Sequence, residues 1–315
     1  MEVNYLIDEW MNENHRFYIK ENTLLRYRCS IDNHIKSFFN RIDILDVTPR
    51  LIQHFIFELK ERESERTHRK LSNSTINNVI AILKLFFKYC VDYEFIDKNP
   101  MNNVKNFHID KYKENKAFSK IEQKRFETYI EKSNDLANFI YIFALYTGLR
   151  IGEMIPLTWK DVNLRTGIVN VDKNISTIKN NNNNWVEKLG TPKSKNSIRV
   201  VPLPRFLITH LKAIKQKYLS KYVFVNNEGI RLTRRNIVNN YAKILKCLRI
   251  KYISFHSLRH TFATRALETN IDIKTISEVL GHANAAMTLN IYSHSLPDHK
   301  RLQMRKMKRI IWIMK

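Results

Sequence analysis

The chain has little glycine, little cysteine and no long apolar segment. Only 6 of its 315 residues are glycine, which argues against a turn-rich β architecture and favours helices. The 3 cysteines, Cys29, Cys90 and Cys247, form no CxxC or other zinc-like pair, and no basic and then apolar leader follows Met1. No apolar run approaches about 20 residues without a charge, the length that a membrane span needs. We therefore expect no metal, no membrane span and a reducing, cytoplasmic location.

Positive charge is what the chain has in excess. Its 54 Lys and Arg outnumber 30 Asp and Glu, which gives a formal net charge of +24 and a pI of about 9.9. Such an excess favours a polyanionic partner, and nucleic acid is the natural candidate. A basic surface without a specific ligand, a ribosomal protein and a membrane-surface protein share this composition. Charge alone therefore does not identify the partner.

Length and hydrophobic content predict two domains. A chain of 315 residues that is 43% hydrophobic can bury more than one core. Residues 1–105 show helical periodicity between polar breaks: Thr48-Pro49 begins one helix, and Ser74 can cap a longer one whose apolar stripe runs to Cys90. Residues 106–118 are polar and lysine-rich, so we place an interdomain linker there.

The second domain, residues 119–315, combines helices with a short β region. Ser119 and Glu122 form a capping-box pattern, and an apolar helix from Leu136 to Tyr146 stops at Gly148. Four β-like segments follow, with a turn of five asparagines at 180–184; they are 168–171, 175–178, 185–189 and 198–203. Residues 222–225 resemble a further strand, and the rest is helical. We predict a mainly α fold with a small β-sheet (α+β).

The first segment that suggests chemistry is Thr147-Gly148-Leu149-Arg150. A buried helix ends on the glycine, and Arg150 begins the next element. Rigid structure therefore holds this arginine at a helix junction. Taken alone, an arginine near a helix end is more often part of a surface ion pair.

The second segment is His256-Ser257-Leu258-Arg259-His260. Residues three apart share a helix face, so His256 and Arg259 project together while Leu258 faces the core. Guanidinium offers planar paired donors to a phosphate, and imidazole can exchange a proton. We expect His260 to face elsewhere, in a structural or capping role.

The third segment is Leu280-Gly281-His282, followed ten residues on by Tyr292. Gly281 fits the end of a helix that begins at Asp272, which would leave His282 fixed just beyond that end. The chain has 14 tyrosines, and a tyrosine taken alone is normally a packing residue. Tyr292 becomes a candidate only through the groups that accompany it.

In order, Arg150, His256-x-x-Arg259, Gly281-His282 and Tyr292 resemble the pattern of the tyrosine recombinases of the phage-integrase family. The resemblance implies that Tyr292 is the nucleophile and that both arginines hold the nonbridging phosphate oxygens. It implies His282 as a further donor and His256 as a general acid or base. It also implies that residues 1–105 form the family's helical, SAM-like core-binding domain, on helix pattern and position alone.

The family also carries a catalytic lysine on a β-hairpin, and Thr191-Pro192-Lys193-Ser194-Lys195 is similar to that segment. We choose Lys193 because it occupies the first-lysine position of the Pro-Lys-Ser/Thr form seen in many mobile-element integrases. Lys195 is the alternative, because hairpin length varies and the sequence does not determine the register. The other lysine is then a DNA contact.

The resemblance implies strand cleavage through a 3′-phosphotyrosyl intermediate, without ATP or metal, by a homotetramer that joins two sites in double-stranded DNA. A directionality factor can accompany such enzymes. The asparagine-rich insert and the two-lysine hairpin favour an integrase of a prophage or integrative conjugative element. An Xer-type resolvase of chromosome dimers is the alternative. A DNA-binding protein that keeps the fold without catalysis, and a type IB topoisomerase, are the alternatives from other classes.

Charge alone suggests further DNA contacts. The basic stretch between two N-terminal helices is as well explained by a solvated loop as by phosphate binding, and a second basic pair lies in the catalytic domain. The candidates are Arg66, Arg69, Lys70, Arg234 and Arg235. Residues 300–315 mix basic and apolar side chains, and this tail can dock on its own domain or on a neighbouring protomer. The chain begins almost directly at the helical domain, so we expect no additional arm-binding domain.

Overall fold

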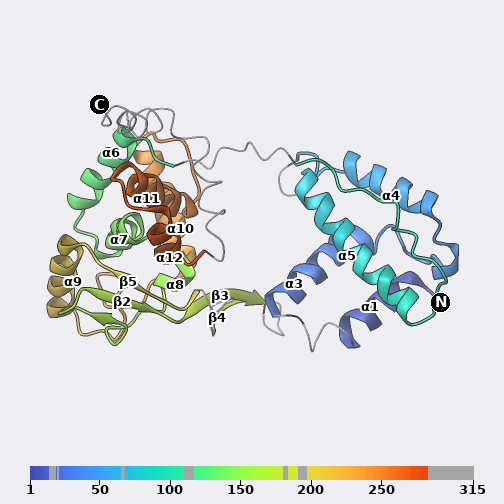
Figure 1. The fold of residues 1–315 in the computed structure, drawn as a ribbon, viewed down its shortest axis with the longest axis horizontal. Helices are drawn as coiled ribbons and strands as arrows, with labels where there is room; N and C mark the ends of the chain where they lie inside the picture. Colours follow the sequence, from blue (N-terminus) through green and yellow to red (C-terminus); the bar gives the residue numbers. More distant parts are fainter. Residues whose placement is uncertain are drawn as a thin grey trace, which may run out of the picture. The chain divides into compact units, whose positions relative to one another are not determined.

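A computed structural model describes residues 1–13, 19, 21–64, 68–109, 117–179, 184–190 and 197–282. The chain divides into two compact units (Figure 1). The N-terminal unit comprises Met1–Lys113 together with Ile178–Val186, and the C-terminal unit comprises Glu114–Thr177 and Glu187–Lys315. Each unit has its own large hydrophobic core. The units are therefore described separately.

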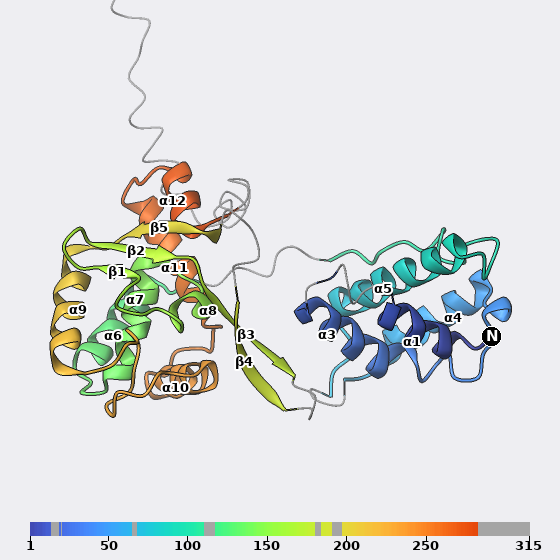
Figure 2. The same ribbon diagram turned by 90° about the horizontal axis from the view of Figure 1, so that it is seen from below.

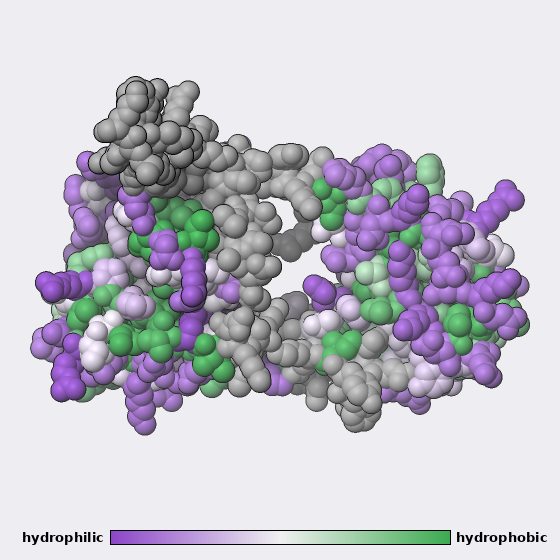
Figure 3. All heavy atoms as spheres, in the orientation of Figure 1, coloured by the Kyte–Doolittle hydropathy of each residue, from purple (hydrophilic) through white to green (hydrophobic). Residues whose placement is uncertain are grey.

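The N-terminal unit is helical throughout its described elements. Apolar residues at helical spacing place large side chains such as Trp10, Phe55 and Phe86 in one core, and the Trp10 and Phe86 rings meet edge to face at 5.7 Å. Hydrophilic side chains predominate on the face of this unit shown in Figure 3. The elements are α1 (Val3–Glu13), α3 (Glu21–Ser30), η1 (Ile31–Ile35), η2 (Ile44–Asp46), α4 (Pro49–Glu61) and α5 (Asn73–Asp92).

Side-chain caps determine where α4 and α5 begin. Thr48 accepts a hydrogen bond from the Leu51 amide and Pro49 follows it, which confirms the predicted start of α4. The predicted cap of α5 is wrong by two residues: Ser72, not Ser74, accepts from the Thr75 amide. Ser72 has the extended backbone that an N-cap needs, whereas Ser74 already lies in the first turn.

The chain after α5 folds back along that helix. The side chain of Asn77 donates to the Phe107 carbonyl at 2.9 Å and accepts from the Phe107 amide at 2.8 Å. Met101 and Val104 are buried in the N-terminal core. Residues 101–107 are thus held against α5, and they include the first two residues of the segment that we predicted as a linker.

Helix α5 alone among the described helices is long and apolar enough to cross a membrane by length and composition. Nine of its residues are buried against the other helices of the N-terminal unit, Phe86 and Phe87 among them. Core packing therefore accounts for its apolar character.

The C-terminal unit packs helices against a small antiparallel sheet, and β3 and β4 form a separate two-stranded sheet. Strands β1, β2 and β5 pair in that order, β3 pairs with β4, and α9 lies beside the three-stranded sheet (Figures 1 and 2). The predicted strand at 222–225 is wrong, because Tyr222 and Val225 form only isolated bridges. The strands are β1 (Val162–Asn163), β2 (Ile168–Val171), β3 (Asn174–Lys179), β4 (Trp185–Gly190) and β5 (Arg199–Pro202).

The helices of this unit form and pack largely as the sequence predicts. The capping box of Ser119 and Glu122 begins α6, and Asp272 caps α12, which ends at Gly281 in the left-handed conformation. Helix α7 is apolar on all sides and packs against α11. The helices are α6 (Lys120–Glu131), η3 (Leu136–Asn138), α7 (Phe139–Thr147), α8 (Ile151–Met154), α9 (Arg205–Lys217), α10 (Arg234–Cys247), α11 (His256–Glu268) and α12 (Ile273–Leu280).

Gly148 joins α7 to the functional segment and has no room for a side chain. Its φ is +64°, and a Cβ atom there would lie 2.6 Å from side-chain atoms of both Leu280 and Phe262. Gly148 thus permits a left-handed turn and the close approach of α11 and α12.

We predict that Gly148→Ala destabilises the protein by about 3 kcal/mol, from a strained φ and overpacking together. Gly229→Ala is the matched control, because Gly229 also has positive φ (+78°) but nothing within 4 Å of its Cβ position. The control should lose only about 1 kcal/mol. Urea denaturation measures both, and equal losses would contradict the role given to close packing.

Candidate active site

Arg150 occupies the N-cap position of α8 and is paired with a buried carboxylate. Its amide donates to Glu153 Oε2 at 2.9 Å, and its Nη1 donates to Glu153 Oε1 at 2.8 Å. The Arg150 side chain stays 35% exposed, while that of Glu153 is only 3% exposed. One edge of the guanidinium is therefore fixed by Glu153 while part of the group faces solvent.

Glu153 lies between two arginines. Arg199, on β5, donates from Nη1 to Oε1 at 3.1 Å and from Nη2 to Oε2 at 2.9 Å. Burial by itself would raise the pKa of Glu153, but the hydrogen bonds and positive charge of Arg199 and Arg150 outweigh burial and lower it. The carboxylate is therefore ionised at neutral pH.

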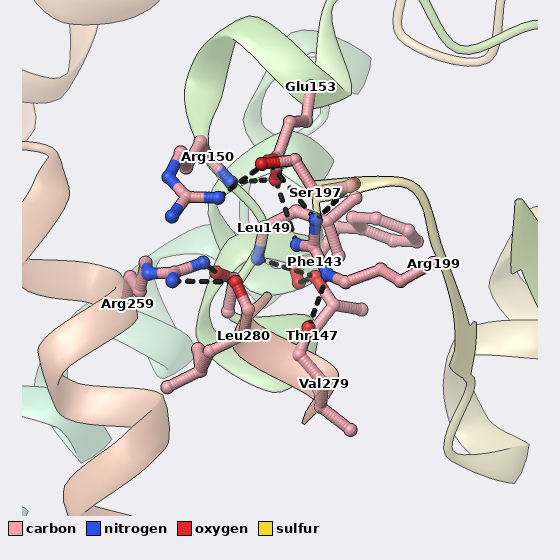
Figure 4. Close-up of polar contacts among 11 residues, drawn as sticks. Phe143, Thr147, Leu149, Arg150, Glu153, Ser197, Arg199, Arg259, Val279 and Leu280 are labelled. Carbon is pink, nitrogen blue, oxygen red and sulfur yellow. Dashed lines mark hydrogen bonds and ion pairs between the residues drawn. The ribbon is translucent and has the colours of Figure 1, made fainter. Parts of the chain in front are cut away.

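Arg259 is buried and connects two helix ends. Its Nη1 donates to the Gly148 carbonyl at 2.9 Å, and its Nη2 donates to the Leu280 carbonyl at 2.7 Å. Figure 4 shows Arg150 and Arg259 on the same side of the cluster, with Arg199 entering from the other side. Two guanidinium groups thus come together from segments more than 100 residues apart in sequence.

His256 and His282 are within electrostatic reach of these arginines and of each other. The pKa of His256 is lowered to about 4, first by surrounding protein atoms that displace water and then by His260, Arg259 and Arg150. The pKa of His282 is lowered to about 4 by burial and by Arg259 and Arg150. His256 as a whole residue is exposed. Both rings are neutral at pH 7 and can take up a proton.

His260 does not face away from the site, so that expectation is wrong. Its ring meets His256 edge to face, with centroids 4.9 Å apart, because residues four apart on a helix share a face. Burial and Arg259 lower its pKa. His260 therefore supports the His256 ring from one side.

The described residues thus bring together Arg150, His256, Arg259 and His282. The other candidates for chemistry, Lys193, Lys195 and Tyr292, lie outside the described residues.

The candidate DNA contacts have different surroundings. Arg69 is exposed, and Lys70 is also exposed but is paired with Glu61 at 2.5 Å. Arg234 and Arg235 are exposed in the first turn of α10. Arg66 lies outside the described residues.

Sequence reasoning missed Glu153 and Arg199, although signals for both are present. Glu153 stands three residues after Arg150, the spacing of a capping box. Arg199 stands two residues before Val201, which is fully buried, and alternate strand residues share a face. An arginine on a buried strand face requires a charged partner, so the alternation alone could have pointed to it.

The described residues contain no group of three or more His, Cys, Asp or Glu side chains placed to hold a metal ion. What they do contain is paired guanidinium donors beside neutral imidazoles. This arrangement suits an oxyanion such as a phosphodiester, whose charge grows during transfer.

Comparisons with known proteins give the family. The model described as phage integrase family matches residues 117–299, and that of the phage integrase N-terminal SAM-like domain matches residues 3–60. A XerC-like tyrosine recombinase of Caldanaerobacter subterraneus subsp. tengcongensis is 31% identical and covers 94% of this chain and 80% of its own. The ICEBs1 integrase of Bacillus subtilis is 29% identical, with coverage of 90% and 76%.

The fold agrees with solved structures. The Tn1549 transposon integrase in complex with transposon right end DNA aligns with a TM-score of 0.76 at 21% identity, covering 98% of this chain and 99% of that one. A lambda integrase dimer bound to a core site aligns with a TM-score of 0.69 at 15% identity, covering 92% and 77%. The predicted mainly α fold with small sheets is confirmed.

This chain belongs to the phage integrase family. It is a tyrosine-type site-specific DNA recombinase, as the ordered motifs implied.

We predict that Glu153→Gln lowers the free energy of unfolding by about 3 kcal/mol at pH 7, because it leaves two arginines without a buried countercharge. The folded-state pKa of Glu153 lies below its ordinary 4.5, so its stabilisation is complete above pH 4.5 and is lost as pH falls through the folded value. Urea denaturation at several pH values should show the difference between wild type and variant shrinking below pH 4.5. A difference that stays constant down to pH 3 would contradict this electrostatic account.

Proposed function

We propose that this recombinase uses Tyr292 to attack the scissile phosphodiester and that it integrates or excises a mobile element. The observation that supports this most directly is the convergence of Arg150 and Arg259 with two neutral histidines in one cluster. An oxyanion is the ligand that satisfies such a cluster.

The two arginines take different parts in holding the phosphate. Arg150, partly exposed and pinned at one nitrogen, presents donors to a nonbridging oxygen. Arg259 is buried, so its positive charge acts with little screening by water. Because the nonbridging oxygens gain charge in the transition state, both contributions should be larger there than in the bound substrate.

The nucleophile needs these cations. A phenol has an unperturbed pKa near 10, so Tyr292 is a weak nucleophile at neutral pH unless nearby positive charge or a base favours its phenolate. His256, neutral and accessible, serves as general acid or base in the proton transfer. His282 donates to the phosphate from the end of α12.

In the strand exchange each bond that forms replaces one that breaks, so no added energy source is needed. Tyr292 Oη forms a bond to phosphorus, the bond to the 5′ oxygen breaks, and a lysine gives that oxygen its proton. We assign this proton to Lys193, with Lys195 as the alternative. The resulting 3′-phosphotyrosyl bond keeps the energy of the phosphodiester, so a 5′-hydroxyl from another strand can reverse the step.

Relatives support a mobile element rather than a chromosome resolvase. They include an integrase of ICEBs1, and the fold matches a transposon integrase bound to transposon end DNA. XerC and XerD proteins also match this chain, so the Xer-type role is the second candidate. A lambda integrase tetramer on a Holliday junction has the same fold, and we propose a homotetramer on two DNA sites here.

The remaining contacts extend the same proposal. Arg69, Arg234 and Arg235 are exposed and suited to phosphate, whereas Lys70 must first leave Glu61. Arg66 and Lys195 are proposed from charge. Cytoplasmic action on the nucleoid and a directionality factor follow from the proposed role.

The native protein should form a covalent adduct with a duplex that carries the element's end sequence and a nick near the cleavage site. The adduct should form in EDTA, resist detergent and disappear with protease, because the bond is a phosphotyrosine made without metal. Denaturing gel electrophoresis measures it.

Tyr292→Phe is the matched control for this adduct, since it removes only the attacking oxygen. An adduct formed by this variant would show that another residue is the nucleophile. If the wild type binds the end sequence but forms no adduct, a DNA-binding protein without catalysis becomes the better description.

Binding of the phosphodiester should be accompanied by proton uptake. The negative phosphate favours the charged imidazoles, so the pKa values of His256 and His282 should rise from about 4, and affinity should increase as pH falls from 8 to 6. Calorimetry in buffers of different ionisation enthalpy measures the protons. Binding of a DNA with a neutral methylphosphonate at the scissile position should be accompanied by the uptake of fewer protons. Identical heats in all buffers would contradict the proposal.

A further inference from the structure

Arg199 makes more polar contacts than an ion pair requires. Besides its two bonds to Glu153, its Nε donates to the Val279 carbonyl at 2.6 Å and its Nη1 to the Ser197 carbonyl at 3.1 Å. The Arg199 side chain is only 6% exposed. It therefore cannot present a broad surface to DNA, and its role has to be sought in what it holds.

Each of these contacts leads to a different part of the candidate site (Figure 4). Through Glu153, Arg199 reaches the carboxylate that pins Arg150. Through Val279, it reaches the last turn of α12, directly before Gly281 and His282. Through Ser197, it reaches the backbone immediately after residues 191–196, the segment that carries the candidate lysines.

The contact with Val279 completes the end of α12. The last four carbonyls of a helix have no partner within the helix. Here the His282 amide donates to the Ser277 carbonyl and the Gly281 amide to the Glu278 carbonyl, both at 3.0 Å. The remaining two carbonyls accept from arginines, Val279 from Arg199 and Leu280 from Arg259. The placement of His282 thus depends on both arginines.

Glu153 does not require Arg199 merely for charge balance. Arg150 already gives this carboxylate one countercharge and an amide donor. The second, more deeply buried arginine fixes the orientation of the carboxylate, since its two Nη atoms each bond a different carboxylate oxygen. Because Arg199 holds the Glu153 carboxylate, the carboxylate keeps Arg150 in one position. The exposed part of Arg150 then faces the ligand.

We propose that Arg199 is a positioning residue of the recombination reaction that sets Arg150 and His282 relative to the scissile phosphate without touching it. This inference rests on the proposed function. Arg199 acts from β5, the strand that follows the lysine-bearing segment, so one buried side chain aligns groups at the start of α8 and at the end of α12.

Arg265 offers a matched control on α11. It also makes three side-chain contacts, to Gln123 Oε1 at 2.8 Å, to Glu268 Oε1 at 2.9 Å and to the Phe118 carbonyl at 2.8 Å. The contacts with Gln123 and Phe118 tie α11 to the start of the unit, the contact with Glu268 lies within α11, and none of the three leads to the site. Arg265→Met therefore removes a comparable structural arginine.

The first test compares single-turnover adduct formation by wild type, Arg199→Met, Arg199→Lys and Arg265→Met at saturating nicked DNA. Arg199→Met should lower the cleavage rate about 100-fold, the effect of a misplacement of about 1 Å, with DNA affinity nearly unchanged. Arg199→Lys should recover part of the rate, because lysine keeps the charge but not the planar donors. Folded Arg265→Met protein should cleave the DNA at the wild-type rate.

A methylphosphonate at the scissile position separates positioning from general structural damage. A methylphosphonate carries less charge in the transition state, so its cleavage depends less on stabilisation of that charge by Arg150. The loss of cleavage rate in Arg199→Met should therefore shrink to about 10-fold or less on this substrate. Two results would overturn the assignment. One is cleavage by Arg199→Met at the wild-type rate, and the other is an equal loss of rate on the phosphodiester and methylphosphonate substrates.

An NMR titration of His282 tests the same inference without DNA. Burial, Arg259 and Arg150 lower its pKa to about 4, and the pKa should rise toward 6.5 in Arg199→Met, because the ring becomes less buried and moves away from both arginines. Arg265→Met should leave it unchanged, and an unchanged value in Arg199→Met would contradict the role at α12. This readout is independent of adduct formation, whose absence in the wild type would contradict the proposed function instead.

Discussion

The candidate site depends on one buried carboxylate held between two arginines. Glu153 fixes Arg150 on the ligand side and is itself fixed by Arg199 from the core side. A buried charge is costly unless it is fully paired and hydrogen-bonded, and here both carboxylate oxygens are bonded by each partner's donors. The pairing that offsets the cost of burying the carboxylate also fixes the positions of Arg150 and Arg199 around it.

A second constraint is the close packing of helix ends. Gly148 has no room for a Cβ atom against Phe262 and Leu280, and its carbonyl receives Arg259. The end of α7 and the end of α12 are therefore joined by the packing of Gly148 against the Leu280 side chain and by the guanidinium of Arg259. This arrangement brings functional groups from distant segments to one place and keeps them there, which a phosphoryl transfer through positioned charges requires.

The histidines of the site are neutral at pH 7, although the arginines beside them are charged. Burial lowers the pKa values of His256, His260 and His282, and the positive charge of Arg259 lowers them further. In the proposed function, the bound phosphate supplies negative charge that raises these pKa values. Binding and protonation are then coupled, so the free enzyme carries less positive charge than the bound state.

The sequence by itself determined the family and the mainly helical fold, because local motifs and caps are encoded in short segments. It also predicted Arg150, His256, Arg259 and His282 as site residues, and the fold places these four in one cluster. It also determined the helix ends at Gly148 and Gly281, which depend on local backbone conformation. Tertiary structure alone decided that Arg199 bonds Glu153 and α12, that His260 contacts His256 and that residues 101–107 fold back on α5. Most of these contacts join residues far apart in the chain, where only the packed fold selects partners.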